Sequence, residues 1–354
     1  MSNSTFALIQ CKLLIISLSF IFSCAPRIEL EDTPLELAES RHFQALSLIE
    51  SQSQSGSTAD RKITVDREIF ELLLASSNGG YSDSYRFLAE LYLEGRGTDA
   101  DIGKGASWLQ EAAIAGDSES MFLLAELMEL EQKGLLSGLA DTASDLYEKS
   151  AELGYAPAQY KVAQQYLSDE NLVNDLQAEV WLDLAANEGH ADAQYALAKL
   201  YRDDQRSPID IQEADKWLQA AAENNVKEAQ FELAMTHATN SSSVSQRSAE
   251  VWLSKSSKNG YPAAQFELAM LLTRDKTREP EEAIEWLTAS AEQGYKPAEC
   301  ELGRMHYRGY LVAQDFSLAR QWFERASQNE AGLSIEPGLM RSDCPQEINV
   351  QSLR

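Results

Sequence analysis

Side chains that commonly perform chemistry are few in this sequence, which has four histidines and four cysteines in 354 residues. The two histidines that could suggest a metal site, His237 and His306, lie far apart and have no cysteine or acidic ligand at the spacing of a zinc site. The sequence contains no glycine-rich phosphate loop, no His-Glu-x-x-His and no Gly-x-Ser-x-Gly. We therefore predict no catalytic residue, no metal and no cofactor, and interpret both histidines as structural.

The amino-terminal segment predicts export. Residues 1–23 carry one charged side chain, Lys12, followed by the apolar run LLIISLSFIF, which is too short to span a bilayer comfortably. The ending Ile-Phe-Ser-Cys resembles a bacterial lipobox, in which the cysteine is diacylated and becomes the first mature residue. We expect lipidation at Cys24 and removal of residues 1–23; an uncleaved anchor and a soluble exported protein are the alternatives. The resemblance to Gram-negative lipoproteins implies, through Ala25, an outer-membrane lipoprotein facing the periplasm.

The charge balance narrows the class of partner. Acidic residues number 56 and basic residues 30, so the formal net charge is −26. The summed field repels phosphate, and we therefore expect no binding to nucleic acid or to anionic lipid headgroups. A basic protein partner is compatible with this charge, and a solvated acidic surface that serves solubility is the alternative.

The elements that would position any binding residues are repeated along the chain. The phrase EVWLDLAANEGHADAQYALAKLY at 179–201 recurs as EVWLSKSSKNGYPAAQFELAMLL at 250–272. Seven units of 34 to 38 residues follow one another, and the last closes near Glu330. They begin at Tyr81, Asp117, Tyr155, His190, Val226, Tyr261 and Tyr295. Repeats of this length indicate stacked supersecondary units that share a continuous core.

One column of the repeat holds all six tryptophans of the protein, and Leu146 fills the seventh place. These structural residues are Trp108, Trp181, Trp217, Trp252, Trp286 and Trp322. The residues four and five positions later are always small, so a neighbouring helix can approach closely. We expect the indole rings to be buried between successive helix pairs. Glycine, or Asn225, should end these helices in the left-handed conformation, except for the last one, where Glu330 closes the array.

A second helix follows in each unit. In AQYALAKLY, residues 193–201, Ala193, Leu197 and Tyr201 recur at four-residue steps on one face. Across the units, one column is mostly aromatic and another is alanine or Gly303. Large and small residues at fixed places are what interlocking helices need.

These columns resemble the Sel-one-like repeat (SLR) family, relatives of the tetratricopeptide repeat, over residues 81–330. The motifs are Leu-(Ala/Gly)-x-x-Tyr, the loop Gly95-Arg96-Gly97, Asp315 before Ala319 and Trp322, and Ala-Ala-x-x-Gly. Tyr310 is taken to replace the second loop glycine in the last unit. The resemblance implies an all-α fold: a right-handed α-solenoid of about seven SLR helix-turn-helix repeats with N- and C-terminal caps.

The flanking segments complete the expected organisation. Residues 24–33 form a tether, and residues 34–80 form a helical N-terminal cap in which Thr33-Pro34 starts the first helix. Within that cap, composition assigns residues 51–60 to a flexible linker, and a second helix is expected at 66–78. Residues 331–354 form a C-terminal tail. In an oxidising compartment Cys300 and Cys344 could pair and pin this tail, with two unpaired thiols as the alternative.

The family resemblance implies a non-enzymatic scaffold or adaptor of the cell envelope that binds a protein of unknown identity along its concave face. The candidate contact residues, equally readable as plain solvent-facing positions, are Lys161, Gln164, Gln165, Lys199, Arg202 and Glu232. One alternative is a periplasmic scaffold lipoprotein of an exopolysaccharide (alginate-type) secretion complex. Another is a surface-displayed ligand of host proteins. A β-lactamase-like, penicillin-binding role is disfavoured because the sequence lacks any Ser-x-x-Lys and has too few cysteines for one disulfide per repeat.

Overall fold

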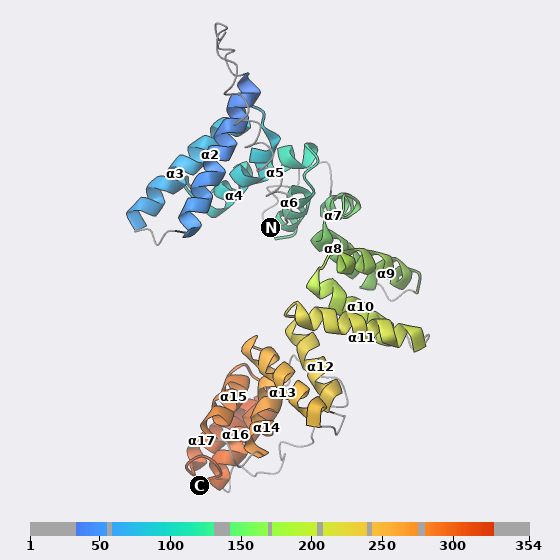
Figure 1. Ribbon diagram of the computed structural model, residues 1–354. Coiled ribbons are helices and arrows are strands. Elements are labelled where there is room, and N and C mark those ends of the chain that lie inside the picture. The colour runs from blue at the N-terminus through green and yellow to red at the C-terminus, as the bar shows by residue number, and fades with distance from the viewer. Residues whose placement is uncertain are drawn as a thin grey trace, which may run out of the picture. The chain divides into compact units, whose positions relative to one another are not determined.

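The computed structural model describes residues 33–54, 59–130, 142–168, 172–203, 208–238, 243–274 and 280–328. Within these ranges the chain forms helices joined by turns, without a strand (Figure 1). None of the described helices is long and apolar enough to cross a membrane. The predicted signal segment and Cys24 lie outside the described residues. The chain divides into two compact units: the first ends at Ala115, and the second begins at Gly116.

Seven consecutive helix pairs make up the repeat array in the described ranges, which confirms the predicted all-α solenoid. Within each pair the two helices pack together, and in the second unit the second helix of a pair also packs against the first helix of the next. The pairs are α4 (Tyr85–Glu94) with α5 (Ile102–Ile114), α6 (Ser118–Leu130) with α7 (Ala143–Glu152), α8 (Ala156–Leu167) with α9 (Leu172–Asn187), α10 (Ala191–Asp203) with α11 (Pro208–Glu223), α12 (Lys227–Ala238) with α13 (Ser243–Lys258), α14 (Pro262–Arg274) with α15 (Pro280–Glu292), and α16 (Lys296–Arg308) with α17 (Phe316–Gln328).

The second helix of a pair ends as the sequence predicts. After α9, Gly189 has φ 88°, and its N–H donates to the Ala186 carbonyl while His190 N–H donates to the Ala185 carbonyl. After α11, Asn225 takes the same left-handed conformation with φ 68°. These bonds satisfy carbonyls that the helix itself leaves without a donor, and they turn the chain into the next pair.

The centre of each pair is filled by the residue that follows the tryptophan column. These buried residues are Leu109, Tyr147, Leu182, Leu218, Leu253, Leu287 and Phe323. Among the tryptophans only Trp217, 9% exposed, is buried, and the other five are half-buried. The expectation of buried indole rings was therefore wrong for most of the column, because one helical step turns the next side chain, not the large ring, toward the interior.

The tryptophans nevertheless link successive core clusters. Trp252 packs against the cluster around Leu218 and also against the cluster around Leu268. Trp286 packs against that second cluster and against the cluster around Leu302. These two indole rings therefore contribute apolar contact to two neighbouring parts of the core, as expected for an array stabilised by its interfaces.

The alanine column is buried throughout the array, and its one exception has a visible cause. Ala89, Ala125, Ala163, Ala198, Ala234 and Ala269 are fully buried. At Gly303 a Cβ atom would lie 2.6 Å from the Phe323 ring. The larger ring on α17 thus requires the smaller residue on α16, because a close-packed core has no room for both.

The N-terminal cap is a helix pair, α2 (Pro34–Gln54) and α3 (Ala59–Asn78). Thr33 Oγ1 accepts a hydrogen bond from Glu36 N–H, and the Glu36 carboxylate accepts one from Thr33 N–H, so the predicted helix start is confirmed as a capping box. The predicted linker 51–60 is wrong at both ends, since α2 continues to Gln54 and α3 begins at Ala59. The first compact unit also contains α4 and α5, so it extends past the predicted cap boundary at residue 80.

The loop between α4 and α5 has a counterpart between α16 and α17. Gly95 and Gly97 have φ 66° and 74°, and Gly309 and Leu311 have φ 65° and 59°. The residue in the place of Gly97 is therefore Leu311, and the assignment of Tyr310 to that place was wrong by one position. Leu311 accepts the left-handed conformation that glycine adopts more easily.

We expect the buried His42 to make the N-terminal cap less stable in acid. Its ring is buried and its Nδ1 lies 2.9 Å from Ser84 Oγ. Burial lowers the pKa of His42 below its ordinary value of 6.5, and the nearby charges of Asp83 and Glu39 oppose this shift only in part. When the pH is below the ordinary pKa of 6.5, the unfolded chain binds more protons at His42 than the folded chain does. The contribution of neutral His42 to the free energy of unfolding should therefore be fully present above pH 6.5. It should be lost as the pH falls toward the lowered pKa of the folded state.

We expect His42→Gln to flatten this decline, because glutamine does not titrate. The measurement is the thermal unfolding midpoint of both proteins at several pH values between about 8 and 5. The comparison uses the slope with pH, since the substitution itself changes the contacts to Ser84. An equal slope in the two proteins would contradict the assignment of the acid sensitivity to His42.

Candidate functional site

The described residues contain no group of three or more histidine, cysteine or acidic side chains that could hold a metal ion. His306 Nδ1 lies 3.4 Å from the Ala313 carbonyl oxygen, and His237 is half-buried on α12. Cys300 is buried and disulfide-bonded. Cys344 lies outside the described residues, so its pairing with Cys300 stays a prediction.

Lys161, one of the predicted contact residues, joins neighbouring repeats. Its Nζ lies 2.9 Å from Glu129 Oε2 on α6 and 5.2 Å from the centre of the Tyr147 ring on α7. The Tyr147 hydroxyl donates to the same Glu129 carboxylate at 3.1 Å. Lys161 is thus held by the preceding repeat.

A second such group joins α10 to α12 and brings two predicted contact residues together. Arg202 forms an ion pair with Glu232, and the Tyr195 hydroxyl donates to the other carboxylate oxygen of Glu232. Burial, followed by the hydrogen bond to Glu232, raises the pKa of Tyr195 well above its ordinary value. Tyr195 is therefore a neutral hydrogen-bond donor at any physiological pH.

The other predicted contact residues do not gather into one place. Gln165 accepts a hydrogen bond of 3.4 Å from Ser144 Oγ, while Lys199 Nζ lies 6.0 Å from the centre of the Tyr195 ring. Gln164 is exposed on α8. Their role in partner binding stays a prediction, since most of these side chains are engaged within the chain.

A buried glutamine near the start of the first helix ties each of four repeats to the one before it. Gln159, Gln194, Gln230 and Gln265 each donate from Nε2 to the carbonyl of the residue eight positions earlier, at the end of the preceding helix. In three of these repeats a residue at the end of the second helix completes the bonding. Asn224 donates to Gln194 Oε1, Asn259 to Gln230 Oε1 and Gln293 to Gln265 Oε1. The buried amides are thereby satisfied on both sides.

The last repeat satisfies the same place with an arginine. Glu299 stands in the glutamine column and is fully buried, and Arg325 Nε lies 3.3 Å from its Oε1. Arg325 also donates to the Ala291 carbonyl at 3.2 Å, and its guanidinium lies 4.8 Å from the centre of the Trp322 ring. The space beside the buried residue of the glutamine column can therefore accommodate a guanidinium between a carboxylate and an indole ring.

The repeat of α8 and α9 leaves this place unfilled. Glu188 stands seven residues after Trp181, where the next three repeats have Asn224, Asn259 and Gln293, and a carboxylate has no hydrogen to donate. Gln159 is 4% exposed, and none of the described residues donates a hydrogen bond to its Oε1. An open pocket of about 510 Å³ lies here, lined by Ala151, Glu152, Gly154, Gln159, Trp181, Leu184 and Glu188.

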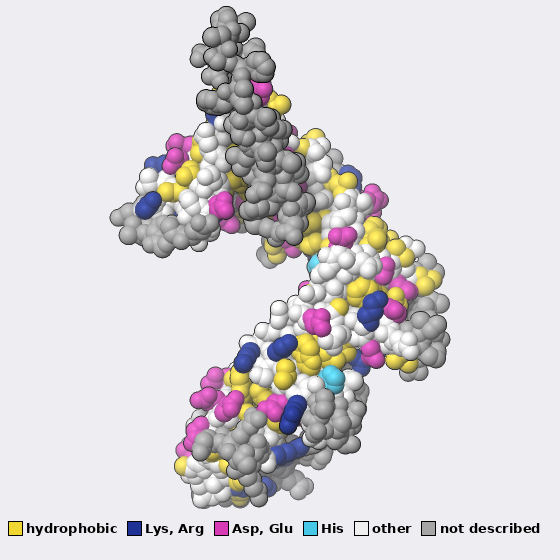
Figure 2. Space-filling model, in the orientation of Figure 1, with side chains coloured by type: hydrophobic (Ala, Val, Ile, Leu, Met, Phe, Trp, Pro, Cys, Tyr) yellow, Lys and Arg dark blue, Asp and Glu magenta, His cyan; other side chains and the backbone are white. Residues whose placement is uncertain are grey.

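An exposed apolar stripe leads along α9 to this pocket. Leu176, Val180 and Leu184 are 48%, 55% and 44% exposed, and their four-residue spacing places them on one helix face. In each of the other described second helices, at most one of the corresponding positions carries an apolar side chain larger than alanine. The corresponding residues are Gly103, Ser107 and Glu111 on α5, Asp145 and Lys149 on α7, Gln212, Lys216 and Ala220 on α11, Arg247, Val251 and Lys255 on α13, Glu281, Glu285 and Ala289 on α15, and Ser317, Gln321 and Arg325 on α17. On the face shown in Figure 2, acidic and basic side chains are intermixed around several small apolar patches. We define the α9 surface as this stripe together with the pocket.

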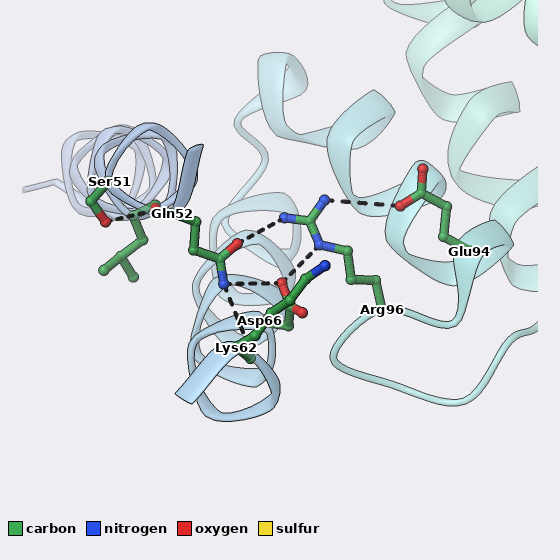
Figure 3. A network of polar contacts seen from close by, with 7 residues as sticks. Ser51, Gln52, Lys62, Asp66, Glu94 and Arg96 are labelled. Atoms are coloured by element: carbon green, nitrogen blue, oxygen red, sulfur yellow. Dashed lines mark hydrogen bonds and ion pairs between the residues drawn. The ribbon is translucent and has the colours of Figure 1, made fainter. Parts of the chain in front are cut away.

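A second pocket, of about 640 Å³, lies in the first compact unit between α3 and the loop after α4. Arg96 Nε lies 2.8 Å from Asp66 Oδ1, and the same guanidinium donates to Gln52 Oε1 at 3.3 Å (Figure 3). Gln52 Nε2 donates in turn to Asp66 at 3.3 Å. The polar groups of these three side chains are hydrogen-bonded to one another, and they hold the N-terminal cap against the first repeat. We therefore interpret this network as structural and not as a binding site.

Sequence reasoning missed the α9 surface. The signal was present, because the residue seven positions beyond Trp217, Trp252 and Trp286 is an amide, whereas the residue seven positions beyond Trp181 is Glu188. Its meaning needs the structure, which shows that this position donates to a buried glutamine some 30 residues earlier in the chain.

Comparison with known proteins supports the architecture. Residues 82–117, 118–155, 156–190, 191–226, 227–261, 262–295 and 296–330 match the family model of the Sel1 repeat. A solved protective antigen of uropathogenic Escherichia coli, which displays an SLR fold, is 24% identical with a TM-score of 0.51, over 83% of this chain and 69% of that one. A Sel1 repeat protein from Oxalobacter formigenes is 23% identical with a TM-score of 0.53, over 90% and 96%. A search of curated proteins found no match.

At these identities the two solved structures support the fold alone. The seven matches to the family model are consecutive and together cover residues 82–330, well over half of the chain. The helix pairs that carry the buried glutamines and the tryptophan column lie within the same residues. The protein therefore belongs to the Sel1 repeat family.

Proposed function

We propose that this protein is a non-enzymatic scaffold that binds a protein partner on the α9 surface. Sel1 repeat proteins generally mediate protein–protein interaction. The observation that carries the proposal is the stripe of Leu176, Val180 and Leu184, because exposed apolar side chains that form one patch mark interaction sites more often than scattered ones. The α9 surface is a better candidate than the residues around Lys161 and Arg202, whose charges are already paired within the chain.

A photo-crosslinking amino acid placed at Val180 tests this proposal in cells that produce the protein. We expect one discrete crosslinked product containing a second protein, identified by mass spectrometry. The matched control carries the same amino acid at Glu285, the equivalent position on α15, where the neighbouring exposed positions are polar. Absence of a product at Val180, or the same products from both positions, would reject the α9 surface as the binding site.

The site of action that we propose is the cell envelope, with the chain exported and anchored by lipid on Cys24. The supporting observations are the apolar run at residues 13–22 and the cysteine that follows it. Growth with a radiolabelled fatty acid should label the mature protein, and Cys24→Ser should abolish the label. Label that persists in the variant, or an unlabelled parent protein, would contradict the anchor.

A scaffold role in exopolysaccharide secretion is a narrower form of the same proposal. The net charge of −26 disfavours direct contact with an anionic polymer, so the chain would act there through a protein partner. A strain that lacks the protein should then lose polymer secretion while polymer synthesis continues.

A further inference from the structure

We infer that the pocket beside Gln159 binds the guanidinium group of an arginine side chain from the partner protein. The inference rests on the proposed binding role of the α9 surface and gives the chemistry of the partner there. It goes beyond that role because it names the group recognised and the atoms that recognise it.

The orientation of the Gln159 amide is fixed by the chain. Its Nε2 donates to the Ala151 carbonyl at 3.2 Å, so its Oε1 is the atom left to accept a hydrogen bond. No described group donates to this oxygen, although the side chain is 4% exposed. A buried acceptor without a donor destabilises the folded chain, and a ligand that supplies an N–H removes that cost.

The pocket also carries negative charge. Glu152 and Glu188 contribute carboxylates to its lining, and carboxylates accept hydrogen bonds without donating any. A neutral donor would satisfy Gln159 Oε1, whereas a cation satisfies the amide oxygen and the carboxylates together. Trp181 also lines the pocket, and an indole ring attracts a cation that lies over its face.

The last repeat shows which cation fits. There Arg325, three residues after Trp322, lies over the indole ring, pairs with Glu299 in the glutamine column and donates to the Ala291 carbonyl. In the repeat of α9 the residue three positions after Trp181 is Leu184, which cannot perform these contacts. The column residue is Gln159 and the carbonyl belongs to Ala151, so the equivalent surroundings are present and the guanidinium is missing.

Arginine suits the pocket better than lysine for physical reasons. The guanidinium is planar and weakly hydrated, stacks on an indole ring, and offers several N–H groups to acceptors that lie in different directions. An ammonium group is more strongly hydrated and would lose more on entering the pocket. The apolar stripe of α9 continues from the pocket, so the arginine should be flanked in the partner by apolar side chains.

Two substitutions should close the pocket without unfolding the chain. Leu184→Arg places a guanidinium three residues after Trp181, as Arg325 stands after Trp322. Glu188→Asn supplies the amide donor that Asn224 supplies in the next repeat. Because each satisfies Gln159 Oε1 from within the chain, we expect both variants to unfold at a temperature no lower than the parent protein.

Binding is measured with the full chain and two capped tripeptides, Gly-Arg-Gly and Gly-Lys-Gly, by calorimetry and by the NMR signal of the Gln159 side-chain amide. We expect the arginine peptide to bind more tightly than the lysine peptide and to shift the Gln159 signal. In Leu184→Arg and Glu188→Asn its affinity should fall by at least about tenfold, as expected for the loss of a charge-assisted hydrogen bond. The control Glu148→Asn removes one charge from an exposed site on α7 outside the pocket lining and should bind as the parent does.

Three outcomes would overturn the inference: no shift of the Gln159 signal with either peptide, equal binding of the two peptides, or unchanged arginine binding in both pocket variants. The proposed function is decided separately by the crosslink from Val180. A partner that crosslinks there equally in the parent and in Glu188→Asn would keep the scaffold role and reject the arginine site. Loss of the crosslink in Glu188→Asn, with the crosslink retained in Glu148→Asn, would support both.

Discussion

Leu182→Ala should lower the free energy of unfolding of the second compact unit by about 2–5 kcal/mol, the usual cost of removing a buried leucine and leaving a cavity. Leu182 is fully buried and belongs to the core cluster that α8 to α12 build together. Because each repeat is stabilised by its neighbours, the loss should weaken both interfaces of its repeat. Denaturant unfolding followed by the helical circular dichroism signal measures it.

The control is the same substitution two residues later. Leu184→Ala truncates a side chain that is 44% exposed, so we expect a change within about 0.5 kcal/mol. If the two variants lost the same stability, the assignment of the core to the residue after the tryptophan would be wrong. Both residues stand on α9, so the comparison holds helix propensity constant.

Gly97→Ala should separate the N-terminal cap from the first repeat. A Cβ atom at this position would lie 2.2 Å from the Asp66 carbonyl oxygen and 3.0 Å from Phe70 Cβ. The new Cβ is attached directly to the loop backbone, and the Asp66 carbonyl belongs to the backbone of α3, so no side-chain rotation can relieve the clash. We therefore expect α3 to move away from the loop and the ion pair between Arg96 and Asp66 to lengthen. The left-handed backbone, with φ 74°, adds about 1–2 kcal/mol for any residue with a Cβ.

Gly80→Ala separates these two causes. Gly80 has φ 85°, but a Cβ there would meet nothing within 4 Å, so only the conformational cost of about 1–2 kcal/mol applies. Hydrogen exchange of the α3 amides and the unfolding midpoint of both variants measure the difference. We expect faster exchange in α3 for Gly97→Ala only; equal effects of the two substitutions would show that the close approach to Asp66 is unimportant.

The repeat and its helix ends could be predicted from the sequence because they depend on local backbone chemistry. Glycine and asparagine adopt the left-handed conformation more easily than other residues, so Gly189 and Asn225 mark helix ends in the sequence itself. The spacing of the tryptophans gives the length of the repeat. The extent of α2 and α3 could not be predicted in this way. The Ser- and Gln-rich composition of residues 51–60 suggests a linker, but packing between the two helices overrides weak local propensity.

The site was harder to predict than the fold, since it depends on contacts between residues far apart in the chain. A charged residue on a helix face has the same sequence pattern whether it is free to contact another protein or forms an ion pair with a neighbouring repeat. Lys161 and Arg202 pair with Glu129 and Glu232, which lie 32 and 30 residues away. The place of Gly303 likewise depends on Phe323, whose ring fills the volume that alanine occupies elsewhere.

The glutamine contacts also bear on how such an array can lengthen. Residues 191–226 carry the acceptor and donor of one contact, Gln194 and Asn224, together with the carbonyl of Ala222 that the next glutamine uses. A tandem duplication of this segment would therefore insert with every buried amide matched. Duplication of residues 156–190 would instead copy Gln159 with its open acceptor and create a second pocket. Duplication would thus keep the buried amides matched at one segment and would copy the proposed arginine pocket at the other.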